Sequence, residues 1–139
     1  MKYIPLAARI CLSSIFLKAG INHTLGFSGF QQAIAGAGLP FASLLAVGTI
    51  IFLLTGSLSL LLGYKIRIGA TLLILFLIPA TLVFHNFLVD LNETNNFLKN
   101  LGLMGGLLML IHAGTGAVSL DLALTPSSTP PGRPGQTLP

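Results

Sequence analysis

Charged side chains are scarce in this sequence. Of its 139 residues, 7 are Lys or Arg and 3 are Asp or Glu, which together make 7% of the chain. A typical soluble domain has about 25% charged residues. So few charges cannot cover the water-facing surface of a soluble domain of this length. With 53% hydrophobic residues, the composition instead points to lipid as the solvent.

Cysteine and cofactor motifs are also nearly absent. Cys11 is the single cysteine, so no disulfide can form within the chain, and in an apolar segment it has the character of a small packing residue. The sequence has no CxxC pair and no glycine-rich nucleotide motif, and its three histidines are scattered. We therefore expect no metal site. The basic residues form no stripe interleaved with aromatics, which argues against nucleic acid as a partner.

Long stretches of the chain carry no charge at all. They lie between Phe41 and Tyr64, between Ile68 and Val89, and between Asn100 and Leu120. A helix needs roughly 20 residues to cross the hydrocarbon core of a bilayer, and each stretch supplies that length. An earlier stretch, at about 3–22, is apolar too but contains Arg9 and Lys18.

We therefore predict an all-α fold, a polytopic membrane protein built as a bundle of four transmembrane helices. The predicted spans are about 3–22, 41–63, 67–89 and 98–120, within a domain of residues 1–124. The alternative for the first span is a cleaved signal peptide, which Lys18 disfavours because it lies where the apolar core or cleavage region of a signal would be. Residues 125–139 hold five of the eight prolines, and we predict a disordered tail there.

Basic residues near the ends of the spans predict the topology. Lys2 precedes the first span, and Lys65 and Arg67 lie in the turn between the second and the third. The loop 23–40 has no Lys or Arg. Because cytoplasmic loops carry an excess of these residues, we expect both termini and the turn in the cytoplasm.

Small residues recur at four-residue spacing in two of the predicted spans. Gly102 and Gly106 lie one turn apart in the fourth span, and Thr55, Ser59 and Gly63 are spaced in the same way in the second. In lipid, helices approach most closely where small residues face one another. We therefore expect the second and fourth spans to be in close contact.

Polar side chains gather near the ends of three predicted spans, on the side opposite the cytoplasm. The set comprises Lys18, Asn22, His23, His85, Asn86, Lys99 and Asn100. Ionisable groups in membrane segments usually face the protein interior or water, and imidazole can pass protons near neutral pH. Two imidazoles and two amines around one cavity predict a site for an anionic or quinone-like head group. The alternative is that the lysines extend to lipid head groups and the histidines cap helix ends.

A second polar group is expected near the cytoplasmic side. Arg9 lies about two turns into the first span, Arg67 begins the third, and Asp121 ends the fourth. If these ends are adjacent, either arginine can neutralise Asp121. We predict a structural ion pair there.

Several short motifs resemble the DoxX family of integral membrane proteins, over about residues 6–122. The matching residues are Arg9, the segments 16–21 and 38–40, Gly56 to Gly63 with Arg67 and Ala70, Phe84 to Phe87, Phe97 to Gly102, Gly105, Gly106, and Ser119 to Asp121. The most specific are the FHNF segment at 84–87 and the FLKN segment at 97–100. Many family members also carry a glutamate near the start of the glycine motif in the second helix. Here Phe52 to Gly56 has no acid, so we expect no role that needs that carboxylate.

The resemblance implies a four-helix bundle linked to respiratory or redox chemistry, since some relatives are subunits of thiosulfate:quinone oxidoreductases. We expect an accessory subunit of a quinone-linked or other membrane oxidoreductase, with quinone as the candidate ligand and no covalently bound cofactor. His85 would donate to a quinone oxygen, while Lys18 or Lys99 stabilises negative charge.

We do not expect the chain to be a catalyst by itself, and the alternative role is a structural or assembly subunit of a larger membrane complex. Its expected partners are the lipid bilayer and either another protein or a second copy of the chain. The expected location is a bacterial inner membrane or a thylakoid.

Overall fold

The chain folds into helices joined by short connections in the computed structural model, which describes residues 1–126. The elements are α1 (Ile4–Leu25), α2 (Phe27–Gly36), α3 (Ala42–Leu62), α4 (Ile66–Phe84), the 3-10 helix η1 (Leu91–Glu93), α5 (Thr94–Ala113) and α6 (Leu120–Leu124). No strand occurs in this range, so the all-α prediction is confirmed. The predicted disordered tail, apart from Thr125 and Pro126, lies outside the described residues.

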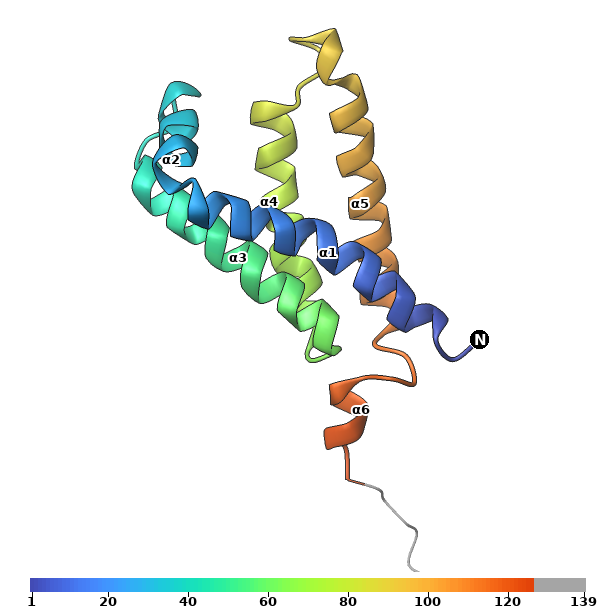
Figure 1. The fold of residues 1–139 in the computed structure, drawn as a ribbon. Helices are drawn as coiled ribbons and strands as arrows, with labels where there is room; N and C mark the ends of the chain where they lie inside the picture. Colours follow the sequence, from blue (N-terminus) through green and yellow to red (C-terminus); the bar gives the residue numbers. More distant parts are fainter. Residues whose placement is uncertain (127–139) are drawn as a thin grey trace, which may run out of the picture.

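Each of the four long helices packs mainly against the next long helix along the chain: α1 against α3, α3 against α4, and α4 against α5 (Figure 1). The N-terminus, the turn between α3 and α4, and α6 lie at one end of the molecule. The short helix α2 and the loop between α4 and α5 lie at the other end. This arrangement places the end of α1, which carries His23, at the same end of the molecule as the loop that carries Asp90 and Glu93. The start of α1 with Arg9 lies at the other end, with Lys65 and Asp121.

A small apolar core joins the four long helices. Phe16 of α1, Leu53 and Leu60 of α3, and Leu73 and Leu77 of α4 are almost completely buried. Leu107 and Leu110 complete the core from α5. Many other large apolar side chains face outward, which in water would be costly but in lipid is the expected state.

Three helices, α1, α3 and α4, are long and apolar enough to cross a membrane. They correspond to the first three predicted spans. The fourth predicted span corresponds to α5, a helix of 20 residues whose first two turns contain Asn95, Asn96, Lys99 and Asn100. These polar residues lower its overall hydropathy and set it apart from the other three.

Helices α3 and α4 approach each other closely at two glycines. A Cβ atom on Gly56 would lie 2.7 Å from Leu73 Cγ, and one on Gly69 would collide with the Ser59 side chain. The predicted contact between the second and fourth spans is therefore wrong, since the small residues of α3 face α4. Gly102 and Gly105 of α5 have open space beside them, and Gly106 faces the Leu12 side chain of α1.

The ends of α4 and α5 differ from the predicted spans because turn-forming residues stop the helices. Helix α4 ends at Phe84 rather than near 89, since the Asn86 side chain accepts the Leu88 amide at 3.0 Å and starts a turn. Helix α5 ends at Ala113 rather than near 120, because Gly114 and Gly116 adopt positive φ angles of 81° and 77°. An uncharged sequence does not by itself reveal either stop.

Helix α2 was not predicted, because the loop 23–40 is interrupted by four glycines, at positions 26, 29, 36 and 38. Its ten residues bury Ile34 and place Phe30 beside the end of α1. The loop expected on the side opposite the cytoplasm is therefore a packed helix, and it forms one wall of the cavity described next.

Candidate ligand-binding site

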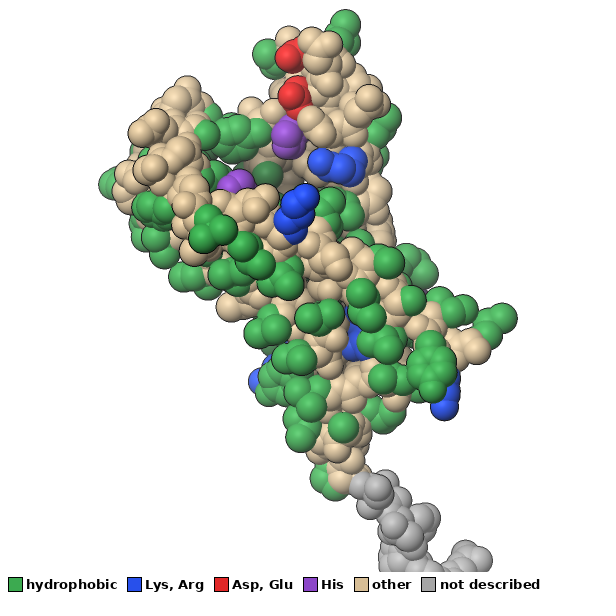
Figure 2. All heavy atoms as spheres, in the orientation of Figure 1, with side chains coloured by type: hydrophobic (Ala, Val, Ile, Leu, Met, Phe, Trp, Pro, Cys, Tyr) green, Lys and Arg blue, Asp and Glu red, His purple; other side chains and the backbone are tan. Residues whose placement is uncertain are grey.

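A cavity of about 350 Å³ lies at the end of the molecule that carries α2. Its walls are largely apolar. The lining residues are His23, Phe30, Ala33, Ile34, Leu39, Leu45, Thr49, Phe76, Pro79, Ala80, Val83, Phe84 and His85. Figure 2 shows a hollow on this side of the molecule, between the part formed by α2 and the adjoining ends of α4 and α5, with histidine, lysine and acidic side chains grouped beside it. Mostly apolar walls with a few polar groups are typical of small-molecule sites.

One wall of the cavity is an aromatic stack between α1 and α2. The rings of His23 and Phe30 lie parallel within 14°, with centroids 3.8 Å apart. Gly26 allows the chain to turn from α1 into α2, which folds the Phe30 ring back onto His23. The stack holds the His23 imidazole flat against the apolar wall.

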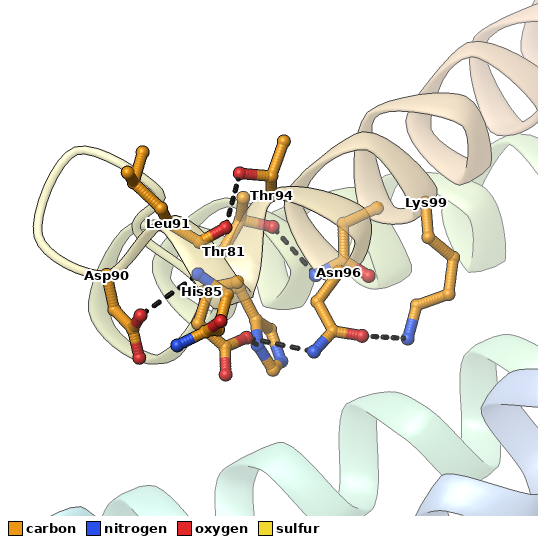
Figure 3. Close-up of polar contacts among 10 residues, drawn as sticks. Thr81, His85, Asp90, Leu91, Thr94, Asn96 and Lys99 are labelled. Atoms are coloured by element: carbon orange, nitrogen blue, oxygen red, sulfur yellow. Dashed lines mark hydrogen bonds and ion pairs between the residues drawn. The ribbon is translucent and has the colours of Figure 1, made fainter.

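The opposite wall ends in a chain of polar contacts that runs from α4 to α5 (Figure 3). His85 Nδ1 and Glu93 Oε2 are 2.6 Å apart, and the same oxygen accepts a hydrogen bond from the Asn96 amide at 2.9 Å. The Lys99 ammonium donates to the Asn96 side-chain oxygen at 3.4 Å. Hydrogen bonds from Asn96 and His85 lower the pKa of the Glu93 carboxyl from its ordinary value, so near neutral pH this group is an ionised acceptor.

The loop that carries Glu93 is itself held in place by short-range hydrogen bonds. Asp90 accepts the Asn92 amide at 2.9 Å and so starts η1. The Thr94 hydroxyl donates to the Leu91 carbonyl at 2.7 Å where α5 begins. These contacts fix the start of α5 and with it the position of the Glu93 carboxylate beside His85.

Asn100 has a different role from the one predicted for it. Its side chain is buried and donates to the Thr81 hydroxyl at 3.0 Å, which joins α5 to α4 inside the protein. It does not line the cavity. The bond satisfies two polar groups that would otherwise be costly in an apolar environment.

The predicted polar set is thus divided by the structure. His23 and His85 line the cavity, and Lys99 is connected to His85 through Asn96 and Glu93. Asn86 forms the turn that ends α4. Lys18 and Asn22 are exposed on α1 and do not line the cavity.

Sequence reasoning missed Glu93, Asn96 and Phe30 as members of this site. Glu93 was visible only as a loop charge, and nothing in its spacing from His85 identifies it as a partner. The available signal was composition, because Glu93 is the one glutamate of the chain and lies eight residues after a histidine.

The second polar group surrounds Arg9 at the opposite end of the molecule. The Arg9 side chain is 1% exposed and its Nη2 donates to the Val118 carbonyl. Asp121 accepts the Lys65 backbone amide at 2.9 Å with its carboxylate, and its own amide donates to the Gly63 carbonyl at 3.1 Å. These contacts tie residues 118–121 to α1 and to the end of α3.

The predicted ion pair of Arg9 or Arg67 with Asp121 is therefore not formed within residues 1–126. The salt bridge found there joins His85 to Glu93 instead. The physical reason is that helix ends leave backbone groups without partners. Here Arg9 Nη2 donates to the Val118 carbonyl, and the Asp121 carboxylate accepts from the Lys65 amide. Arg67 is exposed beside a second cavity of about 430 Å³, which Lys65 and Asp121 also line.

The sequence profile of the DoxX family matches residues 4–86. The chain is 33% identical to the inner membrane protein YqjF of Escherichia coli over 119 residues, which cover 86% of this chain and 90% of that protein. It is 31% identical to the inner membrane protein YphA of the same organism over 121 residues, covering 84% of this chain and 86% of that protein. No solved structure matches this chain significantly.

Proposed function

The chain belongs to the DoxX family, and we propose that it is an accessory subunit of a membrane oxidoreductase that holds a quinone ring in the cavity between α2 and α4. The observation that carries the proposal is the cavity itself. It is about 350 Å³ in volume, its walls include Phe30, Phe76 and Phe84, and its two imidazoles come from different helices. A flat apolar ring with polar oxygens matches those walls.

The imidazoles supply the polar contacts of the proposed site. His23 is held against Phe30 and His85 is held by Glu93, so each ring is oriented before a ligand enters. Preorganised polar groups bind with a smaller loss of conformational entropy than mobile ones. Lys99 adds a positive charge that is connected to His85 through Asn96 and Glu93.

We assign electron transfer itself to a partner protein. The sequence has a single cysteine and no nucleotide-binding motif, and the polar groups of the cavity are suited to holding a ring. The role of this chain is then to take the ring out of the lipid and hold it at a fixed depth and orientation.

The proposed setting is a bacterial inner membrane, because both Escherichia coli relatives are named inner membrane proteins. We propose that α5 is a fourth span, because at 1.5 Å per residue its 20 residues reach about 30 Å, and it packs against α4 through Leu107 and Leu110. We further propose that Lys2, Lys65 and Arg67 face the cytoplasm, since they are grouped at one end. The cavity then opens toward the opposite side.

Labelling of single cysteines tests this orientation. In a Cys11→Ala background, Gln32→Cys on α2 should react with an impermeant maleimide added outside right-side-out spheroplasts, whereas Tyr64→Cys should react only after the membrane is opened. Both positions are accessible on the surface of the protein. The reverse pattern contradicts the proposed orientation.

Quinone binding can be followed by fluorescence, because the chain contains no tryptophan. Phe76→Trp places a single reporter in the cavity wall, and Leu82→Trp places one on the outward face of the same helix. Titration with a short-chain ubiquinone or menaquinone in detergent should quench the cavity reporter with saturation, and the outward reporter only in proportion to the quinone dissolved in the micelle.

The blocking variant Ala80→Phe should abolish the saturable quenching, because it fills the cavity. Linear quenching of both reporters contradicts quinone binding and favours the structural or assembly subunit.

A further inference from the structure

His85 has one ring nitrogen committed to the protein. Nδ1 lies 2.6 Å from Glu93 Oε2, and the same oxygen accepts a second hydrogen bond from Asn96. An ionised carboxylate has no hydrogen to give, so the hydrogen of this bond belongs to Nδ1. In a neutral imidazole the other nitrogen, Nε2, then carries a lone pair and no hydrogen.

The Nε2 atom has no hydrogen-bond partner among residues 1–126, while its ring lines the cavity. The His85 side chain is 31% exposed, so this lone pair is open to the cavity and accepts a hydrogen bond from a ligand that brings an O–H or N–H donor. A ligand that offers only carbonyl or ether oxygens cannot bond to Nε2, because its oxygens and the nitrogen are both hydrogen-bond acceptors.

We propose that the His85–Glu93 pair makes the cavity selective for an aromatic ring that carries a hydroxyl group, such as a phenol or the reduced, quinol form of a quinone, over the same ring with its oxygen oxidised or methylated. This inference rests on the proposed function, because it concerns a ring bound in the same cavity. It also reverses the expectation that His85 donates to a quinone oxygen. Glu93 is a positioning residue, since it acts on the ligand through His85.

Three features of the site support the inference. The Asn96 bond and the His85 bond keep the Glu93 carboxyl ionised near neutral pH. The contacts of Asp90 and Thr94 fix the loop, so the carboxylate cannot easily turn away from the ring. The aromatic side chains of Phe76 and Phe84 give a ring the flat apolar surfaces it packs against.

The direct test is the position of the proton on His85 in the wild-type protein. Nitrogen-15 spectra of histidine-labelled protein at about pH 8, where an ordinary imidazole is neutral, distinguish a hydrogen on Nδ1 from one on Nε2. The three histidines are assigned with His23→Ala, His85→Ala and His112→Ala. We expect the hydrogen of His85 on Nδ1, and its return to Nε2 in Glu93→Ala. A hydrogen on Nε2 in the wild type overturns the inference.

The functional test compares a para-alkyl phenol with its methyl ether, two probes of nearly equal shape that differ in one donor. The phenol should bind the wild type about tenfold more tightly, the usual worth of one hydrogen bond in a protected site. In Glu93→Ala the ratio should fall to within about twofold, since the ring is then free to present either nitrogen.

His23→Ala is the matched control, because His23 lines the same cavity and has no carboxylate partner within residues 1–126. It should weaken both probes together and leave their ratio unchanged. Equal affinity of phenol and ether in the wild type, with saturable binding of both, overturns the selectivity but leaves quinone binding intact. Absence of saturable binding for the phenol, the ether and the short-chain quinone overturns the proposed function and the inference with it.

Discussion

Gly56 of α3 and Gly69 of α4 lie against each other's backbone. A Cβ atom on Gly56 would be 3.0 Å from the Gly69 carbonyl oxygen, and a Cβ atom on Gly69 would be 3.1 Å from the Gly56 carbonyl oxygen. The contact is reciprocal, and Ser59 and Leu73 close it on the two sides. It sets the distance between α3 and α4, and α4 contributes much of the cavity wall.

This contact predicts that Gly56→Ala destabilises the protein. The new methyl group would meet Leu73 Cγ at 2.7 Å and the Gly69 backbone, so the helices must move apart. We expect a cost of about 1–3 kcal/mol, measured as a lower Tm in detergent. Gly102→Ala on α5 is the control, because nothing lies within 4 Å of a Cβ there. Equal melting of Gly56→Ala and the wild type would contradict the close contact.

Gly63→Ala is predicted to lower the stability of the protein by more than the backbone strain of an alanine at positive φ. Gly63 has a φ of 67°, and a Cβ there would collide with the Arg9 guanidinium. The comparison is Gly38→Ala, whose φ is 76° but whose Cβ would meet nothing within 4 Å. Both variants carry a left-handed strain of about 1–2 kcal/mol, and only Gly63→Ala should also displace Arg9. We expect the lower Tm for Gly63→Ala. Equal losses in the two variants would show that Arg9 moves aside without cost.

The buried bond between Asn100 and Thr81 predicts coupled effects on stability. Thr81→Val removes the acceptor and leaves the Asn100 amide unpaired inside the protein, with an expected cost of about 1–2 kcal/mol. Adding Asn100→Leu should then cost less than it does alone, because the polar pair is already broken. Thr71→Val on the exposed side of α4 is the control, since its hydroxyl bonds to its own helix. Additive losses in the double variant would mean that the two side chains act independently.

Acidification is predicted to loosen the loop that joins α4 and α5. A carboxyl with a lowered pKa in the folded protein stabilises it above the unfolded pKa, and this contribution is lost as the pH falls through the folded value. Glu93 is such a group, through its hydrogen bonds with Asn96 and His85. The protection of the amides of residues 86–93 against exchange, relative to an unfolded chain at the same pH, should therefore fall from the ordinary glutamate range, about pH 4, downward.

The same measurement on Glu93→Gln isolates the titration of this one group. Asp90 and Asp121 are present in both proteins, so the difference between the two profiles belongs to Glu93. In the variant the acid-induced change should be much smaller. Identical profiles would mean that the Glu93 carboxylate does not hold the loop.

The comparison of sequence with structure shows which features are local. Uncharged stretches of roughly 20 residues were enough to predict α3 and α4, and an apolar stretch was enough to predict α1 despite Arg9 and Lys18, because crossing lipid depends on length and hydropathy within one segment. Turn residues decided the rest. Asn86 ends α4 early with its own side chain, and Gly114 ends α5 by adopting a positive φ angle.

The sequence by itself determined that this is an all-α membrane protein of the DoxX family, and it singled out His23 and His85 as candidate ligand-binding residues. The tertiary structure alone decided that both line one cavity, that the buried Asn100 joins α5 to α4 by a hydrogen bond to Thr81, and that Arg9 bonds to the Val118 carbonyl rather than to Asp121. The physical reason is the distance along the chain over which each feature is determined. Hydropathy is a property of each segment, whereas a hydrogen bond such as that between His85 and Glu93 depends on where two helix ends come to lie.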